Sequence, residues 1–483
     1  MKKCKFNFKT TYTNLPGQLF VKSKPASVPF PKVVILNNDL AASLGLDFSD
    51  FTDSEKAGIF SGNLIAPSSI PFSQSYAGHQ FGNFTLLGDG RAHILGEYIA
   101  QDGKRFDIQL KGSGRTPFSR SGDGKAALGP MLREYLISEA MYNLGVPTTR
   151  SLAVVATGEN IERETSLPGA ILTRVSSSHI RCGTFEFANF KKDKNISEKL
   201  MNYTIERHYP DLLDCENKAL SLLQAVMMRQ IDLVVNWMRI GFIHGVMNTD
   251  NMAISGETID YGPCAFMNNY DPNTVFSSID YHGRYSYTNQ PKITHWNIVR
   301  FAESLLPLID NDLAIAINLA ERIVDQFPSI YQAKWLDMMK SKLGLDSYDS
   351  GDEELIYDLL NWMYVNKLDY TNTFRDLSKE NKPEGDIYNC KDFDEFYQKY
   401  RKRSSKNTIS KQSSILLMKS SNPVVIPRNH LVEDALAAAS EGELKLYLNL
   451  LDAVKDPYKD KEGLEYFKYY SGDDDQYKTF CGT

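Results

Sequence analysis

The stretch between positions 244 and 262 decides how this chain folds. It reads His244-Gly245-Val246-Met247-Asn248-Thr249-Asp250-Asn251 and continues, nine residues after Asn251, with Asp260-Tyr261-Gly262. Mg²⁺ on nucleotide phosphates takes hard oxygen ligands, usually one or two protein carboxylates or amides, while phosphates and water complete the octahedron. Asn251 and Asp260 offer one ligand of each kind, so the stretch predicts a metal and nucleotide site.

Two short apolar segments separate these two residues. Met252-Ala253-Ile254 and Thr258-Ile259 are typical of strands, and Ser255-Gly256-Glu257 between them is typical of a turn. We therefore expect a hairpin that brings the amide and the carboxylate side by side.

The same stretch has the spacing of a protein-kinase signature. Kinases use H-R-D-L-x-x-x-N and a later D-F-G, in which the first Asp is the base and the Asn and second Asp hold metal. His244 and Asn251 are seven positions apart, as in that motif. Val246 stands at the place of the base, however, and valine cannot accept a proton, so ordinary phosphoryl transfer is in doubt. The alternative is that these Asn, Asp and Gly residues only form turns and caps.

Length, charge and cysteines narrow the class of protein. The 483 residues suffice for two or three domains, or for one bilobal enzyme with appendages. A formal charge of −6 gives no global basic field, so nucleic acid is not an expected partner. There is neither a signal-peptide core nor an apolar run of membrane-spanning length, so we expect no membrane partner and a cytoplasmic location. Six scattered cysteines without a CxxC pair indicate a reducing compartment.

A lysine ends the third strand of a predicted antiparallel meander. The strands begin at Phe84 and include Ala92–Ile99 and 106–110, with glycine turns between them, and Lys111 follows directly. A lysine there matches the third-strand lysine of kinases, which contacts nucleotide phosphates. A solvated surface lysine is the alternative.

Glycine-rich turns surround this lysine. They are Gly88-Asp89-Gly90-Arg91, Gly112-Ser113-Gly114-Arg115 and Gly122-Asp123-Gly124-Lys125. Backbone N–H groups in such turns can wrap phosphates. Simple hairpins and flexible surface loops are the alternatives.

A helix over 130–144 and two arginines add possible partners for the lysine and for phosphate. The helix offers Glu134 or Glu139 to pair with Lys111, and periodicity does not choose between them. Arg174 ends a predicted strand and Arg181 follows seven residues later, a pair that suits anion clamping. Surface salt bridges are the alternative for both arginines.

The second half of the chain is predicted to be α-rich. Residues 217–240 carry the apolar stripe of a long core helix, and further helices are expected over 296–309, 313–327, 332–343, 353–365 and 430–454. The basic run 401–406 is read as a solvated linker.

Together these motifs resemble the selenoprotein O family, also called the YdiU group, along essentially the whole chain. The segments that carry the resemblance are Gln74-Ser75-Tyr76-Ala77-Gly78-His79-Gln80-Phe81-Gly82, Leu87-Gly88-Asp89-Gly90-Arg91-Ala92, Gln109-Leu110-Lys111-Gly112-Ser113-Gly114-Arg115-Thr116-Pro117, Ser178-His179-Ile180-Arg181 and the 244–263 block.

The resemblance implies an α+β, protein-kinase-like bilobal fold. We expect an extension over 1–70 that wraps a β-rich N-lobe over 71–185. An α-rich C-lobe over 186–400 would contain the catalytic and metal segment 244–263, and a helical extension with a redox tail would follow over 401–483.

The resemblance also implies an activity, protein adenylyltransfer from ATP to Ser, Thr or Tyr hydroxyls, with ATP bound in reverse. It implies Mg²⁺, with Mn²⁺ as the alternative, on Asn251 and Asp260, and Asp250 as proton acceptor. The other implied roles are nucleotide binding by Gly88, Gly90, Arg91, Lys111, Asp123, Gly124, Arg174, Arg181 and Asp260, support of Lys111 by Glu134, and a possible redox pair of Cys264 with Cys481.

Two other functions compete with this interpretation. One is an inactive nucleotide-binding pseudokinase that serves as an interaction module, and the other is a protein nucleotidyltransferase that uses UTP. A complete metal pair argues against the inactive protein, because binding alone does not need one.

Overall fold

The computed structural model describes residues 6–470 and 477–480 and is organised around one antiparallel sheet. Its strand order is β1-β3-β6-β7-β10-β9-β2, and β8 pairs with β10 outside this path. The bounds are β1 Phe20–Lys22, β2 Lys32–Leu36, β3 Phe72–Gln74, β6 Ala92–Ile99, β7 Arg105–Lys111, β8 Ala126–Ala127, β9 Arg150–Glu162 and β10 Ser166–Ser176.

Two small antiparallel pairs lie outside this sheet. One is β4 (Ala77–Gln80) with β5 (Asn83–Leu86), and the other is β11 (Phe242–Ile243) with β12 (Ala265–Phe266). Because β11 and β12 pair, they hold together the two ends of the segment that connects them.

The helices are mostly in the second half of the chain. Their bounds are α1 Asn38–Ser43, α2 Asp53–Ser61, α3 Leu128–Asn143, α4 Cys182–Phe190, α5 Lys194–His208, α6 Lys218–Ile240, α7 Gln290–Ile309, α8 Leu313–Val324, α9 Phe327–Lys342, α10 Asp352–Val365, α11 Tyr370–Leu377, α12 Lys391–Ser404, α13 Lys411–Ser421, α14 Asn429–Ser440, α15 Lys445–Ala453 and α16 Glu465–Lys468.

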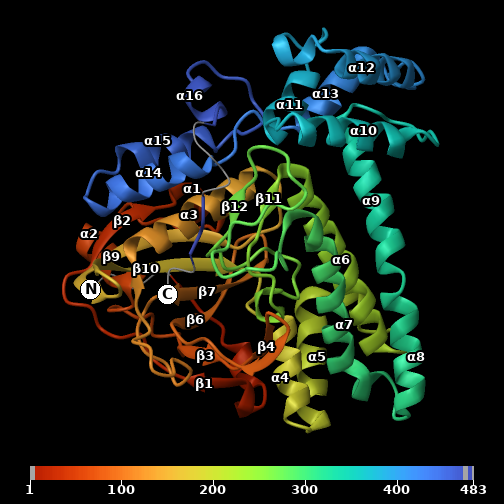
Figure 1. Ribbon diagram of the computed structural model, residues 1–483. Coiled ribbons are helices and arrows are strands. Elements are labelled where there is room, and N and C mark those ends of the chain that lie inside the picture. The colour runs from red at the N-terminus through yellow and green to blue at the C-terminus, as the bar shows by residue number, and fades with distance from the viewer. Residues whose placement is uncertain (1–5, 471–476, 481–483) are drawn as a thin grey trace.

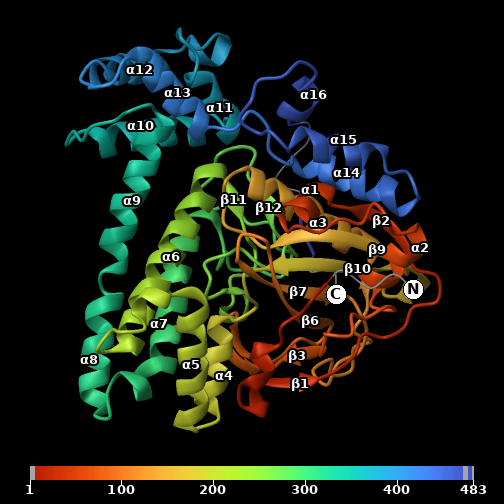
Figure 2. The same cartoon turned by 180° about the vertical axis from the view of Figure 1, so that it is seen from behind.

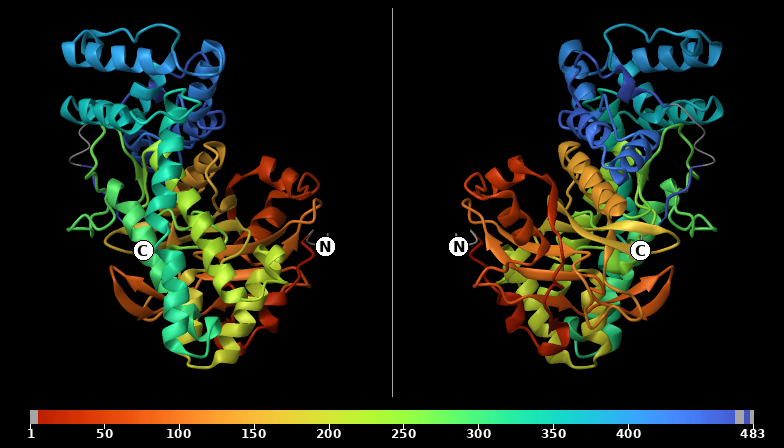
Figure 3. Two further views of the ribbon diagram at one scale, coloured as in Figure 1. Left: turned by 90° about the vertical axis from the view of Figure 1, so that its right-hand side faces the viewer. Right: turned by 90° about the vertical axis from the view of Figure 1, so that its left-hand side faces the viewer.

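These helices group on one side of the sheet and above it. Figure 1 shows the sheet on the left and α4 to α9 on the right, and the reverse view of Figure 2 agrees. From the side, α10 to α13 lie at the end of the molecule that is uppermost in Figure 3, next to the blue C-terminal helices, while α14 packs on α3. In the described residues no helix combines the length and apolarity that a membrane crossing requires.

The long helix α6 lies between the two main apolar clusters. Asn217 caps its first turn by accepting a hydrogen bond from the Leu220 N–H, and Gly241 ends it with a φ of 69°. Leu223, Val226 and Met227 pack in the larger cluster, and Trp237 packs in the cluster beneath α3. The predicted core helix over 217–240 is therefore confirmed.

The leading segment has regular structure, because it contains α1 and α2 as well as the strands β1 and β2. Strands β1 and β2 form the two edges of the main sheet, where Val33 pairs with Val155 of β9. Helix α2 starts with a capping box between Thr52 and Glu55.

Three further expectations are corrected. The first strand of the predicted meander, β5, pairs with β4 and not with β6, because the turn at 88–90 separates it from the main sheet. The run 401–406 is mostly the last turn of α12, where Arg403 is buried against Asp352. The single helix predicted over 430–454 is divided into α14 and α15, and Gly442 between them has a φ of +96°.

Candidate active site

A cleft of about 720 Å³ lies between the glycine turns of the sheet and the segment that follows β11. Its volume is in the range of pockets that bind nucleotide-sized ligands. The predicted residues that line it are Gly88, Gly90, Arg91, Lys111, Asp123, Gly124, Arg174, Arg181, Asp250, Asn251 and Asp260.

Neighbouring central strands place the cations on one face of the sheet. Leu172 of β10 pairs with Lys111 of β7, and Arg174 pairs with Gln109. Because side chains alternate along a strand, Gln109, Lys111 and Arg174 all face the cleft. Lys111 is only 6% exposed and Arg174 only 2%.

Glu134 of α3 joins these cations. Lys111 Nζ lies 2.6 Å from Glu134 Oε2, and Arg174 Nε lies 2.8 Å from Glu134 Oε1. The other candidate, Glu139, is turned away and accepts hydrogen bonds from Arg150 and Asn37. The structure therefore pairs Lys111 with Glu134.

Asp260 completes the cluster from the opposite wall. Its Oδ1 atom lies 2.7 Å from Lys111 Nζ and 2.7 Å from Arg174 Nη2, and its Oδ2 lies 4.0 Å from Arg181 Nη2. Burial alone would raise the pKa of Asp260, but the three cations outweigh it and hold the pKa well below its usual value. Asp260 is therefore ionised at neutral pH.

Arg181 is positioned by residues that the sequence did not single out. Its guanidinium lies 4.4 Å from the centre of the Tyr76 ring, and its Nη1 lies 3.5 Å from Asp89 Oδ1. Tyr76 and Asp89 fall inside segments that carry the family resemblance, which was the available signal for both.

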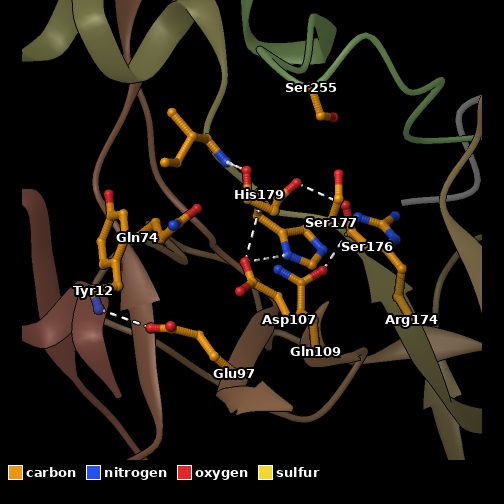
Figure 4. A network of polar contacts seen from close by, with 12 residues as sticks. Tyr12, Gln74, Glu97, Asp107, Gln109, Arg174, Ser176, Ser177, His179 and Ser255 are labelled. Carbon is orange, nitrogen blue, oxygen red and sulfur yellow. Dashed lines mark hydrogen bonds and ion pairs between the residues drawn. The ribbon is translucent and has the colours of Figure 1, made fainter. Parts of the chain in front are cut away.

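A buried polar network fixes the loop between the two arginines (Figure 4). Asp107 Oδ2 accepts the His179 backbone N–H at 3.0 Å, and Asp107 Oδ1 lies 2.6 Å from Arg207 Nη2. Although burial opposes it, Arg207 and His179 lower the pKa of Asp107 to about 2. His179 is thus an orienting residue, and no sequence pattern indicated Arg207.

The residues after β11 form a short 3-10 turn, Thr249–Asn251. Thr249 is fixed by a hydrogen bond to Glu186, and Asn248 Oδ1 accepts the Phe81 N–H and the Tyr285 hydroxyl. Asn251 Nδ2 donates to Val246 O at 3.0 Å. In the described part of the chain, the side-chain oxygen of Asn251, Oδ1, accepts no hydrogen bond and remains available as a ligand atom.

Asp250 is a lone carboxylate at the edge of the cleft. Its Oδ1 atom is buried and has no hydrogen-bond partner among the described residues. Burial raises the pKa of Asp250 to about 7. A carboxylate with that pKa is suited to exchange a proton near neutral pH.

The hairpin expected between Asn251 and Asp260 is wrong. Ala253 forms a bridge with Arg181, and Thr258 forms one with Thr148. The Ile254 N–H donates to Ile180 O and the Thr258 N–H to Pro147 O, both at 2.9 Å, so neighbouring segments take the donors that a hairpin would use. Asn251 and Asp260 nevertheless line the same cleft.

The turn at 122–125 is held against the sheet. Asp123 forms two hydrogen bonds of 3.0 Å with Arg163. Gly124 has a φ of +70°, and a Cβ there would lie 2.2 Å from Gly114 O. This turn therefore requires glycine, and its Asp123 is engaged at the cleft wall.

The proposed redox pair is only partly described. Cys264 is fully buried, and burial raises the pKa of its thiol to about 11. Cys481 lies outside the described residues.

Comparisons with known proteins identify the class as protein nucleotidyltransferase. Relatives described as "Protein nucleotidyltransferase YdiU" match almost end to end. That of Nitrosococcus oceani is 53% identical over 480 residues, which cover 99% of this chain and 97% of the relative. The relative of Alcanivorax borkumensis is 54% identical over 480 residues, 99% of each chain, and that of Pelagibacter ubique is 53% identical over 479 residues, again 99% of each.

A family model gives the particular family. The model described as "Protein adenylyltransferase SelO" matches residues 2–455. The chain therefore belongs to the SelO family and is a nucleotidyltransferase, and the resemblance inferred from its motifs is confirmed.

Proposed function

We propose that this protein transfers AMP from ATP to Ser, Thr or Tyr hydroxyls of other proteins. The observation that carries the proposal is Asp250, whose Oδ1 atom is buried without a hydrogen-bond partner among the described residues, in the cleft that Lys111, Arg174 and Arg181 also line. Valine replaces the kinase base at position 246, so a γ-phosphoryl transfer of the kinase type lacks its proton acceptor.

The same proposal includes a kinase-like arrangement of two lobes. Residues 71–185 hold most strands of the main sheet and would be the N-lobe, and residues 186–400 would be the C-lobe. The segments 1–70 and 401–483 would be extensions. The first contributes both edge strands, so it completes the sheet as well as covering it.

The residues at the cleft fit a divalent metal. Asn251 and Asp260 provide an amide oxygen and an ionised carboxylate, the hard ligands that Mg²⁺ or Mn²⁺ prefers. When bound, such an ion would neutralise phosphate charge and polarise the phosphorus that is attacked.

The chain's own residues would divide the remaining work. Lys111, Arg174 and Arg181 would hold the β- and γ-phosphates deep in the cleft, so that ATP lies reversed with its α-phosphorus toward Asp250. Asp250 would accept the proton of the substrate hydroxyl while the hydroxyl oxygen bonds to the α-phosphorus. The bond between the α-phosphorus and the oxygen that bridges it to the β-phosphate breaks. Pyrophosphate leaves with the electron pair of that bond, and Lys111, Arg174 and Arg181 stabilise its charge.

Labelled ATP tests this proposal. We expect α-labelled ATP to label protein substrates and the enzyme itself, and γ-labelled ATP to label neither. Transfer of the γ label would instead indicate kinase activity. Nucleotide binding without transfer of either label would support the inactive pseudokinase. Parallel reactions with α-labelled UTP decide between the two nucleotides.

Asp260→Ala should abolish transfer, because Asp260 is the only carboxylate of the proposed metal pair. The measurement is α-label transfer by folded, purified variant protein. Retained activity would remove Asn251 and Asp260 as the metal site.

We further propose a cytoplasmic protein controlled by a Cys264–Cys481 disulfide. The described cysteines, Cys182, Cys215, Cys264 and Cys390, are unpaired, which is usual in a reducing compartment.

A further inference from the structure

The tail residues 477–480 lie in extended form against the loop between β12 and α7, joined to it by one parallel bridge. The Thr479 N–H donates to Phe276 O at 2.8 Å, and the Ser278 N–H donates to Thr479 O at 2.9 Å. Ser277 and Thr479 form a parallel bridge. In Figure 1 this blue segment runs beside the green loops near β12.

Side chains anchor the tail next to the catalytic cleft. Thr479 is 4% exposed, and its hydroxyl donates to Pro263 O at 2.7 Å. Pro263 lines the cleft that contains Asp250. The seat of the tail is therefore continuous with the wall of the cleft.

An aromatic contact fixes the tail two residues earlier. The Tyr477 ring lies 5.7 Å from the Phe276 ring, and its hydroxyl donates to Glu433 Oε1 at 2.6 Å. Arg133 Nη2 donates to the same hydroxyl at 3.3 Å. Phe480, in contrast, is 71% exposed, so the side chains alternate between buried and exposed positions as in a strand.

Strand addition is a common way for proteins to bind extended peptides. Main-chain hydrogen bonds supply affinity without regard to sequence, and pockets for alternate side chains supply selectivity. Here the loop at 276–278 supplies the main-chain bonds. Tyr477 and Thr479 occupy the two selective positions. The surface formed by residues 276–278 and Pro263 therefore suits an aromatic residue followed two positions later by Ser or Thr.

We propose that residues 276–278 form a docking strand for extended segments of protein substrates, and that the enzyme's own tail occupies it. The inference rests on the proposed function, because it supplies the protein acceptor of the AMP group. A substrate segment must displace the tail to bind, and it then lies beside the Pro263 wall of the cleft.

Thr479→Pro in the full-length chain releases the tail, because proline lacks both the N–H bonded to Phe276 O and the hydroxyl bonded to Pro263 O. Denatured α-casein serves as an unfolded acceptor with many hydroxyls. We expect its KM to fall about threefold or more, as the loss of two hydrogen bonds from the tail implies. The KM for ATP should stay unchanged. Phe480→Ala is the matched control, and it should change neither constant.

A binding measurement separates this inference from the transfer reaction. A capped, fluorescent peptide with the sequence of residues 477–480 should bind the Thr479→Pro variant more tightly than the unmodified chain, and α-casein should displace it while ATP does not. Adding Ser278→Pro should abolish this binding while circular dichroism and Tm report an intact fold. An unchanged casein KM together with no peptide binding, or displacement of the peptide by ATP, would overturn the docking strand. Peptide binding without any AMP transfer would instead leave the docking strand standing and reject the proposed function.

Discussion

Asp250 owes its position to a glycine in a neighbouring strand. A Cβ on Gly78 of β4 would lie 2.2 Å from Asp250 Oδ1, far inside van der Waals contact. Thr249 is held from the same strand, since its Oγ1 accepts the His79 N–H at 2.8 Å. The absence of one side chain therefore lets the carboxylate lie against β4 at the edge of the cleft.

Gly78→Ala tests this contact. The added methyl group should displace the Asp250 carboxylate, so we expect kcat for AMP transfer to fall about tenfold or more, toward the larger loss expected when a general base is removed. ATP affinity, measured by calorimetry, should change little. Gly129→Ala, where the nearest atom is 4.0 Å away, is the control and should be neutral. Unchanged kcat in Gly78→Ala would mean that the Asp250 position is not critical.

Lys111→Ala should weaken nucleotide binding. It removes a buried ammonium that now contacts Glu134 and Asp260 and would contact phosphate. A charge-assisted hydrogen bond contributes about 1.5–3 kcal/mol, so the Kd for ATP should rise by about one to two orders of magnitude. Isothermal titration measures it, and equal Kd values would show that Lys111 does not touch the nucleotide.

The sequence predicts the polar and charged residues of the cleft but not what holds them in place. Lys111, Asn251 and Asp260 stand in motifs whose chemistry is recognisable from residue type and spacing. Glu134 and Glu139 are both buried on α3, so apolar periodicity could not distinguish them. Their partners are decided by where β7 and β9 pass the helix, which is a property of tertiary packing.

At the scale of elements, the turn at 255–257, which was expected to close a hairpin, instead holds the loop between Arg174 and Arg181. Glu257 Oε2 accepts the Ser177 N–H at 3.1 Å and the hydroxyls of Ser176 and Ser177 at 3.0 and 2.7 Å. Local strand propensity around the turn was correct in kind, because Ala253 and Thr258 do form bridges. Their partners come from distant segments, and the sequence pattern contains no signal for that choice.

Asp107 ties the same loop to α5 through Arg207. The pKa of its carboxyl is lowered to about 2 in the folded protein, against an unfolded value near 3.8. A depressed folded pKa stabilises the fold above the unfolded pKa, and this contribution is lost as pH falls from about 3.8 through 2. The shift corresponds to stabilisation on the order of 2 kcal/mol.

Asp107→Asn should therefore lower the free energy of unfolding at pH 7 by on the order of 2 kcal/mol. Urea unfolding at pH 7, 5 and 3 provides the measurement. The difference between variant and parent should be constant at the two higher values and smaller at the lowest, because the parent is losing the same contribution. A difference that does not change with pH would indicate a loss of packing and not of charge.

At the scale of the whole molecule, the α+β class and the long helices are predictable, whereas the completion of the sheet is not. Apolar periodicity predicts the helices over 217–240 and 353–365, and recognisable helix-ending signals mark where they stop. The edge strands β1 and β2 are short, lie among prolines, and pair with β3 and β9, which follow about 50 and 120 residues later. Such long-range pairing leaves almost no local trace.

The tail lies against the segment that follows the proposed metal site, and we predict redox control from that proximity. The Thr479 hydroxyl donates a hydrogen bond to the backbone oxygen of Pro263, the residue before Cys264. Cys481 is two positions after Thr479 in the sequence. The Cys264 thiol is fully buried with a pKa of about 11, so it is almost wholly protonated at neutral pH and a poor nucleophile while the tail is docked. We predict that added hydrogen peroxide, which is reduced to water as it takes two electrons and two protons from the thiols, nevertheless yields a Cys264–Cys481 disulfide that holds the tail on the docking strand. A thiol reductant should reverse this and restore transfer to protein substrates. Peptide mapping under non-reducing conditions identifies the linked peptide, and α-label transfer with and without reductant measures the effect.

Three variants serve as controls. Cys264→Ser and Cys481→Ser should each abolish the effect of reductant on transfer. Cys390→Ser, which removes a thiol outside the proposed pair, should preserve it. Absence of the linked peptide, together with activity indifferent to reductant, would reject the disulfide and leave the docked tail as a purely noncovalent contact.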